Sequence, residues 1–332
     1  MVSLKKSGIL SIIGNTPLIK LDKISRQYQF NIFAKMESLN PGGSVKDRTS
    51  ARILMDAFER GLIDEKTTVI ESSSGNMAIG LAQVCKYLDL KLIVVVDRNI
   101  NEQNLDILKT YGAEISLIEN PKSQETLLEA RLRRVNELLD VTPKGFWTNQ
   151  YGNYENVRTH RETMAEISQT LNGDLDYIFV ATSTCGTLMG CAEYVIENNL
   201  NTKVVAVDAK GSVLFGDEPQ KRLIPGHGAG RKSQFLNENL IHKAVHISDL
   251  ESVKGCRRLL DKEAILAGGS SGAIIAAIEK IKDEIPYQAN VAAIICDRGE
   301  RYLKTIYNDE WVRQNLGVNL SAKYKTPLKM VA

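Results

Sequence analysis

Short apolar runs alternate along this chain with longer segments in which apolar residues recur at the spacing of a helix. The apolar runs, which are rich in β-branched residues, lie at 67–71, 91–97, 113–118, 177–181, 203–208 and 291–296. Helical spacing is found at 47–60, 76–88, 102–111, 124–139, 155–171 and 187–198. Strands covered by helices on both faces are apolar throughout, so this alternation predicts parallel βαβ units and a layered α/β fold.

The length of 332 residues is enough for about two domains. The clearest interruption between two βα series is the segment 141–152, which contains Pro143, Gly145 and Gly152. Proline and glycine commonly mark turns and breaks. The sequence therefore predicts two three-layer α/β domains with mostly parallel sheets and a domain change near residue 150.

The composition narrows the class of protein. Forty-two Lys and Arg residues stand against forty Asp and Glu residues, so the formal charge of +2 disfavours a nucleic-acid partner. No segment reaches the roughly eighteen consecutive apolar residues of a membrane-spanning helix, and five cysteines without a CxxC pair are typical of reduced thiols. We therefore expect a cytoplasmic protein without a membrane partner. The four histidines lack a metal-binding spacing, so no metal is expected.

Three loops next to predicted helix starts combine hydroxyl side chains with glycine. They are 71–76 (ESSSGN), 182–187 (TSTCGT) and 267–272 (AGGSSG). Ligands of open α/β sheets bind at the carboxyl ends of the strands, and helix N-termini bind anions. The three loops therefore predict an anion-holding site. Ordinary helix capping by Ser and Thr is the alternative for any one of them.

A lysine occupies an unusual position in the segment 40–48 (NPGGSVKDR), where a Pro-Gly-Gly turn leads into a predicted helix. Lys46 lies in the first helical turn, where the positive end of the helix dipole disfavours an ammonium group and lowers its pKa. A lysine with a lowered pKa suits Schiff-base chemistry. The pattern taken alone also fits a solvated surface lysine.

Taken together, these four segments resemble the cysteine synthase and cystathionine β-synthase family, whose members are fold-type II enzymes dependent on pyridoxal 5′-phosphate. The resemblance begins at 13–18 (IGNTPL) and continues to 297–299 (DRG), with all four segments in the family order. It implies a fold like the tryptophan synthase β-subunit, with a smaller mobile domain at 40–149. The larger domain would comprise 12–39 and 150–320, and 321–332 would form a C-terminal tail.

The resemblance also implies roles for individual residues. Lys46 would hold the cofactor covalently and move the α-proton of the substrate. Asn76 would bind the phenolic oxygen of the cofactor, and Ser270 would face its pyridine nitrogen. The cofactor phosphate would be held by Ser183, Thr184, Cys185, Gly186 and Thr187. The substrate carboxylate would be held by Ser73, Ser74, Asn76, Met77 and Gln150.

Several details differ from the common cysteine synthase pattern. Met77 and Ala78 follow Asn76, and Tyr151 follows Gln150 where phenylalanine is usual. With the motifs 207–212 (VDAKGS) and 297–303 (DRGERYL), these details resemble the enzymes that make N-(2-amino-2-carboxyethyl)-L-glutamate. Such enzymes condense O-phospho-L-serine with L-glutamate through an aminoacrylate, on the route to 2,3-diaminopropionate for siderophores or peptide antibiotics. The resemblance also implies a homodimer.

The donor and acceptor sites are assigned to particular side chains. Arg131, Tyr151 and Ser183 suit a phosphate leaving group, although Arg131 also fits a solvated position beside two other arginines of its helix. His227 and Arg231 are candidates for an acceptor carboxylate, or else surface loop residues. Two other functions stay open: a cysteine synthase that uses sulfide with O-acetylserine or O-phosphoserine, and a non-catalytic binding relative.

Overall fold

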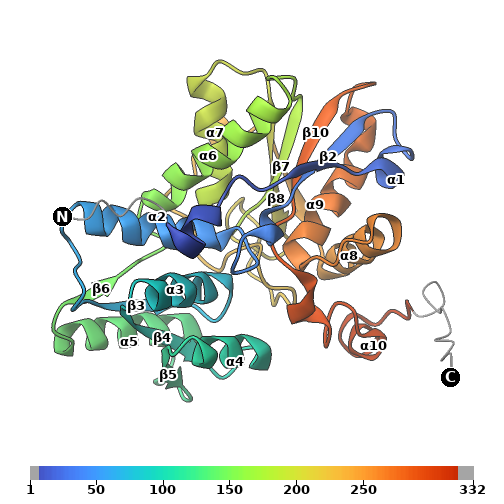
Figure 1. The fold of residues 1–332 in the computed structure, drawn as a ribbon. Helices are drawn as coiled ribbons and strands as arrows, with labels where there is room; N and C mark the ends of the chain where they lie inside the picture. The colour runs from blue at the N-terminus through green and yellow to red at the C-terminus, as the bar shows by residue number, and fades with distance from the viewer. Residues whose placement is uncertain (1–6, 321–332) are drawn as a thin grey trace, which may run out of the picture.

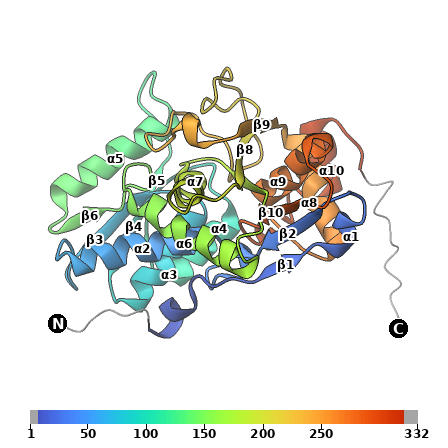
Figure 2. The same ribbon diagram turned by 90° about the horizontal axis from the view of Figure 1, so that it is seen from above.

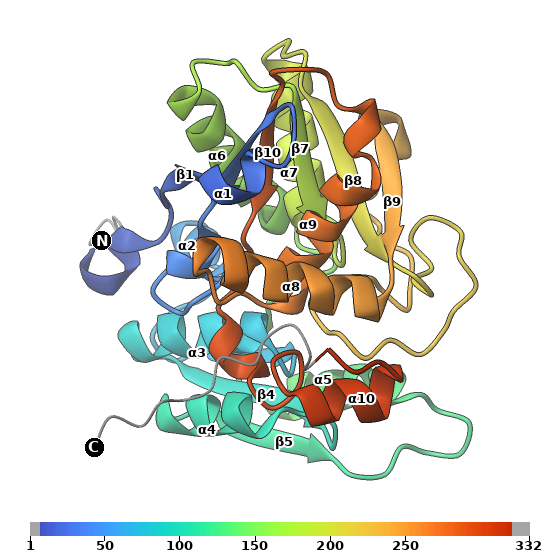
Figure 3. The ribbon, with the colours of Figure 1, turned by 90° about the vertical axis from the view of Figure 1, so that its right-hand side faces the viewer.

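The computed structural model describes residues 7–320, so the expected tail at 321–332 lies outside the described residues. Figures 1 and 3 show two separate sheets, with the smaller one below the larger one. The larger sheet has the strand order β1, β2, β10, β7, β8, β9, and the smaller sheet has the order β5, β4, β3, β6. Every neighbouring pair is parallel except β1 and β2, which confirms the predicted α/β class with mostly parallel sheets.

The strands of the larger sheet come from both ends of the described chain. They are β1 (Leu18–Lys20), β2 (Asn31–Lys35), β7 (Tyr177–Ala181), β8 (Lys203–Ala209), β9 (Lys243–Ile247) and β10 (Asn290–Ile294). Strand β10 pairs with β2 on one side and with β7 on the other. The strands of the smaller sheet lie between β2 and β7 in sequence: β3 (Thr68–Ser72), β4 (Lys91–Asp97), β5 (Glu114–Ile118) and β6 (Gly145–Trp147).

Helices cover both faces of each sheet. In the first half of the chain they are α1 (Asp22–Ser25), α2 (Lys46–Glu59), α3 (Asn76–Tyr87), α4 (Glu102–Thr110) and α5 (Leu127–Val141). In the second half they are α6 (Glu155–Thr170), α7 (Gly186–Glu197), α8 (Asp249–Glu263), α9 (Gly269–Lys280) and α10 (Asp309–Leu316). Figure 2 shows α3 and α5 on opposite faces of the smaller sheet, and Figure 3 shows α8 beside α9.

The side chains of β4 point alternately to the two faces of the smaller sheet, and helices cover both faces. Val94 and Val96 belong to the apolar cluster beneath α2 and α3, whereas Ile93 and Val95 belong to the cluster beneath α5. Successive side chains of a strand point to opposite faces, so one apolar strand is buried by helices on both sides. Among residues 7–320, no helix is long and apolar enough to cross a membrane.

Helix α5 begins later than its apolar spacing predicts. The expected start was residue 124, but the helix begins at Leu127 because Thr126 forms a capping box with Glu129. In this arrangement the Thr126 hydroxyl accepts the Glu129 N–H, and the Glu129 carboxylate accepts the Thr126 N–H. The capping box therefore sets the first residue of α5.

Candidate functional site

One cavity of about 280 Å³ brings the predicted site residues together. Its lining combines loops that follow β3 and β7 with the first turns of α2 and α9 and with part of α5. The candidate residues for the cofactor, the substrate carboxylate and the leaving group all line it: Lys46, Ser73, Ser74, Asn76, Met77, Arg131, Gln150, Tyr151, Ser183, Thr184, Cys185, Gly186, Thr187 and Ser270. The two acceptor candidates, His227 and Arg231, are not among its lining residues. Lining residues to which the sequence analysis assigned no role include Val45, Ser72, Leu128, Pro225, Gly226 and Cys296.

Lys46 is the first residue of α2 and lines this cavity. Burial lowers the pKa of its ammonium group below the ordinary lysine value, in the direction expected from its position at the helix start. The surface alternative for this lysine therefore does not apply. A lowered pKa makes a lysine amine better suited to act as a nucleophile and a base.

Asp47, the residue after Lys46, holds the turn that precedes the helix. The Asp47 carboxylate accepts the Gly42 N–H at 2.5 Å, and burial raises the pKa of Asp47 to about 7. A Cβ at position 42 would lie 2.7 Å from Asp47 Oδ1, so the turn requires glycine. The sequence predicted the turn but not the role of Asp47 in it.

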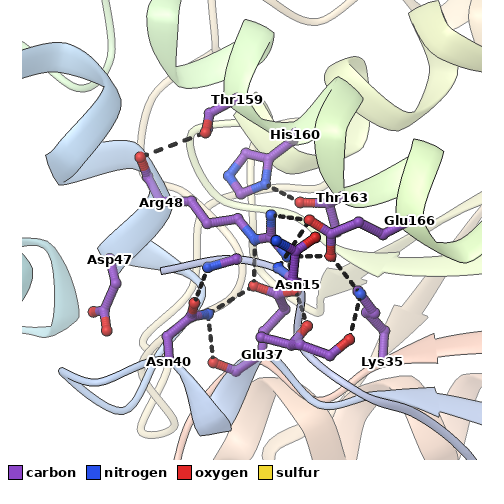
Figure 4. A network of polar contacts seen from close by, with 12 residues as sticks. Asn15, Lys35, Glu37, Asn40, Asp47, Arg48, Thr159, His160, Thr163 and Glu166 are labelled. Carbon is purple, nitrogen blue, oxygen red and sulfur yellow. Dashed lines mark hydrogen bonds and ion pairs between the residues drawn. The ribbon is translucent and has the colours of Figure 1, made fainter. Parts of the chain in front are cut away.

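A buried cluster of charged side chains anchors α2 to the larger sheet, as Figure 4 shows. Arg48 donates to both carboxylate oxygens of Glu37 at 2.8 Å and to both oxygens of Glu166 at 2.7 Å. Lys35, at the end of β2, also donates to Glu166 at 2.5 Å. Burial opposes ionisation of Glu166, but the hydrogen bonds and charges of Arg48 and Lys35 lower its pKa to about 2. The position of Lys46 therefore depends on a network two residues further along its helix.

The loop between β7 and α7 presents backbone N–H groups to the cavity. Cys185 has a φ of +64°, and this left-handed residue turns the chain into the helix that begins at Gly186. The N–H groups in the first turn of a helix lack helical partners. The Ser233 hydroxyl donates to the Thr184 carbonyl at 2.7 Å and supports the loop from outside the cavity. This geometry suits a phosphate group.

Asn156 connects this loop to two other parts of the site. Its amide nitrogen donates to the Thr184 hydroxyl at 3.0 Å and to the Gln150 carbonyl at 2.8 Å. Its oxygen accepts the Thr49 hydroxyl of α2 at 3.1 Å. A Cβ on Gly186 would lie 2.4 Å from that oxygen, so glycine lets the loop approach. Sequence reasoning missed Asn156, because nothing in its own helix shows these distant partners.

Glu71 supports the other side of the cavity from within β3. Its carboxylate accepts the Thr148 hydroxyl at 2.5 Å and the Gln150 N–H at 3.3 Å. The side chain is buried, and burial raises its pKa above the usual glutamate value. Glu71 therefore fixes the backbone of Gln150 beside the serine loop. The sequence analysis assigned no role to Glu71, whose one local signal is a carboxylate within an otherwise apolar strand.

Two thiols line the cavity together with Lys46. Cys185 belongs to the β7–α7 loop, and Cys296 follows β10. Burial raises the pKa of each thiol to about 12. Both therefore stay protonated near neutral pH, and a protonated thiol is not a nucleophile.

Arg131 turns toward the cavity while its neighbours in α5 do not. Arg133 and Arg134 pair with Glu137 on the outer side of the helix. Arg131 is 18% exposed and lies 3.3 Å from a carboxylate oxygen of Asp97. Its Nε is buried without a hydrogen-bond partner in the part of the chain that the structure describes. Arg131 is therefore not the solvated helix residue of the alternative interpretation.

The two residues considered for an acceptor carboxylate behave differently. The Arg231 guanidinium lies 4.0 Å from the centre of the Tyr151 ring, which lines the cavity. His227 is buried, and its Nε2 lies 3.4 Å from the Ser252 hydroxyl. Burial lowers the pKa of His227 to about 4, so it is neutral near pH 7 and does not supply a positive charge. Any contact of His227 with an acceptor carboxylate would therefore be a hydrogen bond from a neutral imidazole and not an ion pair.

Among the described residues there is no cluster of three or more His, Cys, Asp or Glu side chains that could hold a metal ion.

Comparison with protein families identifies one model that spans most of the chain. The model described as "Pyridoxal-phosphate dependent enzyme" matches residues 9–297. This range includes every candidate site residue.

Solved structures give a consistent result. An O-acetylserine-dependent cystathionine β-synthase from Helicobacter pylori is 32% identical, with a TM-score of 0.83 over 92% of this chain and 100% of that chain. A hydrogen sulfide-producing enzyme from Fusobacterium nucleatum is 31% identical, with a TM-score of 0.83 over 90% of this chain and 99% of that chain. An O-ureido-L-serine synthase is 28% identical, with a TM-score of 0.83 over 90% of this chain and 94% of that chain.

Proposed function

Because this chain belongs to the family of pyridoxal-phosphate-dependent enzymes, we propose that it condenses O-phospho-L-serine with L-glutamate. The product would be N-(2-amino-2-carboxyethyl)-L-glutamate. The bond between the serine β-carbon and the phosphate oxygen breaks, phosphate leaves, and the glutamate nitrogen forms the new bond to that carbon with loss of a proton. The observation that carries the proposal is Arg131, an arginine with an unpartnered Nε that lines the cavity. The homodimer and the domain boundary near residue 150 stay predictions.

The residues of the cavity fit pyridoxal phosphate. The volume of about 280 Å³ is close to the lower end of ligand sites, which span about 300–1,000 Å³. Lys46 offers an amine, and the start of α7 offers N–H groups to a phosphate. A Cβ on Gly226 would lie 3.4 Å from Ser270 Oγ, so glycine leaves space beside that hydroxyl.

The side chains around the cofactor have distinct tasks in this proposal. When bound, pyridoxal phosphate withdraws electrons from the α-carbon of an amino acid, so that its β-substituent can be replaced. Lys46 takes the α-proton, which its lowered pKa favours near neutral pH. Ser270 offers a neutral hydroxyl to the pyridine nitrogen and so does not hold a proton there. Closure of the serine loop over the substrate carboxylate excludes water.

The proposed preference for O-phosphoserine follows from the charge of its leaving group. A phosphate ester carries close to two negative charges near neutral pH, whereas an acetate ester carries none. Arg131 supplies a cation, and the hydroxyls of Tyr151 and Ser183 line the same cavity. The ion pair with Asp97 fixes the guanidinium and offsets part of its charge. We therefore assign the phosphate leaving group to this side of the cavity.

Replacing Arg131 with methionine should reduce kcat/KM for O-phosphoserine by about ten- to a hundredfold. The reason is that the variant loses a charge-assisted hydrogen bond, which contributes about 1.5–3 kcal/mol. The reaction with O-acetylserine should change by less than about threefold. Arg134→Met is the matched control, because Arg134 lies on the same helix and pairs with Glu137. Equal losses with both donors would show that Arg131 does not select the leaving group.

The acceptor assignment rests on the arginines near Tyr151, which lines the cavity. Glutamate must present its amine to the β-carbon while its carboxylates stay outside the cofactor site, where cations can bind them. The Arg231 guanidinium stacks on the Tyr151 ring. Arg222, in the same loop, donates to the His227 carbonyl at 3.4 Å. These two arginines support an acceptor that carries carboxylates more than they support sulfide.

Product analysis tests the proposed acceptor directly. The enzyme is incubated with O-phosphoserine and either glutamate or sulfide, and the products are identified by mass. We expect the glutamate adduct to form at least about tenfold faster than cysteine at equal acceptor concentration. In the Arg231→Met variant, the KM for glutamate should rise by about tenfold, since one charged hydrogen bond is lost.

Formation of cysteine without any glutamate adduct would contradict the proposal and favour the sulfide alternative. Absence of both products, with no cofactor bound to the purified protein, would favour a non-catalytic relative.

A further inference from the structure

Asp297 lies where three loops of the cavity meet, just beyond the end of β10. Its carbonyl accepts the Gly268 N–H at 3.2 Å, in the segment that opens α9. The preceding residue pairs with the segment that leads into α2, since Val45 donates to the Cys296 carbonyl at 2.8 Å. Position 268 requires glycine, because a Cβ there would lie 2.0 Å from Asp297 Oδ1.

The side chain of Asp297 reaches a third loop through Asn76. It is 1% exposed, and its Oδ2 accepts the Asn76 amide at 2.8 Å and the Tyr302 hydroxyl at 2.6 Å. From the other side, the Arg301 guanidinium donates to Asn76 Oδ1 and, at 2.6 Å, to the Gly42 carbonyl. The amide of Asn76 is therefore held at both ends by the segment that follows β10.

These two contacts give the amide one orientation. A carboxylate accepts and a guanidinium donates, so Asp297 selects the nitrogen end of the amide and Arg301 selects the oxygen end. An amide nitrogen carries two hydrogens, and Asp297 takes one of them. We propose that Asp297 and Arg301 are positioning residues that orient the Asn76 amide, so that its second N–H is available to the phenolic oxygen of the cofactor. This inference rests on the role proposed for Asn76.

The surrounding chemistry supports this arrangement. Burial raises the pKa of Tyr302 well above the ordinary tyrosine value, so its hydroxyl keeps its proton and donates. Burial also raises the pKa of Asp297, while the hydrogen bonds from Tyr302 and Asn76 and the charge of Arg301 oppose that rise. An amide with both ends occupied loses the freedom to flip, and this preorganises it for a ligand.

The absorbance of the bound cofactor tests the inference without turnover. The visible spectrum of the holoenzyme is titrated with pH, and cofactor affinity is measured by fluorescence. In Arg301→Met and Asp297→Asn, we expect the midpoint of the spectral titration to move by about one pH unit, which is a tenfold change in that equilibrium. Cofactor affinity should fall by about tenfold.

Arg298→Met is the matched control. Arg298 belongs to the same segment, and its Nε donates to the Ser38 carbonyl at 3.0 Å and not to Asn76. It should leave both the spectrum and the affinity unchanged. Thermal unfolding of each holoenzyme identifies a variant that fails to fold. Arg301→Lys keeps the positive charge and a hydrogen-bond donor. Its spectral midpoint should therefore lie closer to the wild-type value than that of Arg301→Met.

A double-mutant cycle separates positioning from a structural effect. Because Arg301 acts through Asn76, Arg301→Met should cause no further spectral shift in an Asn76→Ala background. A shift of the same size in both backgrounds, or no shift in either single variant of Asp297 and Arg301, would overturn the inference. If Asn76→Ala alone left the spectrum unchanged, the proposed cofactor contact of Asn76 itself would be wrong.

Discussion

Replacing Lys46 with alanine should abolish turnover and the covalent retention of pyridoxal phosphate. Proton transfer by a positioned side chain contributes about 10²–10⁴-fold to a rate, and loss of covalent attachment adds to this. We therefore expect a fall of at least about 10⁴-fold in kcat/KM with O-phosphoserine. The visible band of the purified wild-type protein, which borohydride removes, should be absent from the variant.

Lys66→Ala is the control for this experiment, because Lys66 is an exposed lysine in the turn before β3. It should keep the band and the activity. The environment of Lys46 explains the difference, since burial lowers the pKa of its amine while the cavity gives the amine access to a ligand. A Lys46→Ala variant that kept a borohydride-sensitive band would show that another lysine carries the cofactor.

Local sequence patterns predicted five of the six interior strands, and missed β2. The apolar runs at 91–97 and 177–181 correspond to β4 and β7 without a shift, because both strands are covered on two faces. By contrast, β1 and β6 are three residues long and lie at sheet edges, so their pattern is too short to separate from a loop. Helices α8 and α10 were also missed, since amphipathic helices on the surface carry many polar residues.

The cavity was predictable because its parts are loops with recognisable chemistry, each adjacent to a predicted helix. The partners that hold those loops were not predictable. Glu71, Asn156 and Asp297 act on residues that are distant in sequence, and only the tertiary fold brings them together. The surface alternative for His227 was wrong for the same reason, since only the tertiary fold buries this side chain.

Replacing Glu37 with glutamine should lower the free energy of unfolding by about 3–5 kcal/mol, because it leaves the buried Arg48 with one carboxylate instead of two. Glu37 is fully buried and accepts from Arg48, from the Asn40 amide at 2.8 Å and from the Thr16 hydroxyl at 2.7 Å. The urea midpoint of the variant measures the loss.

Glu310→Gln is the control for this loss, because its carboxylate pairs with Arg313 on the surface of α10 and both side chains are more than half exposed. Exposed ion pairs contribute about 0–1 kcal/mol. If the two variants lost the same stability, the buried cluster would contribute no more than a surface pair.

The same cluster should make the fold sensitive to acid. The pKa of Glu166 is about 2 in the folded protein, below the ordinary value of 4.5 that applies when the chain is unfolded. A carboxyl group with a lowered folded pKa stabilises the protein above its unfolded pKa, and the contribution disappears as the pH falls through its folded pKa. Glu166→Gln should therefore weaken the fold at pH 7 and flatten the loss of stability between about pH 4.5 and 2. An unchanged acid profile in this variant would show that other carboxylates control acid unfolding.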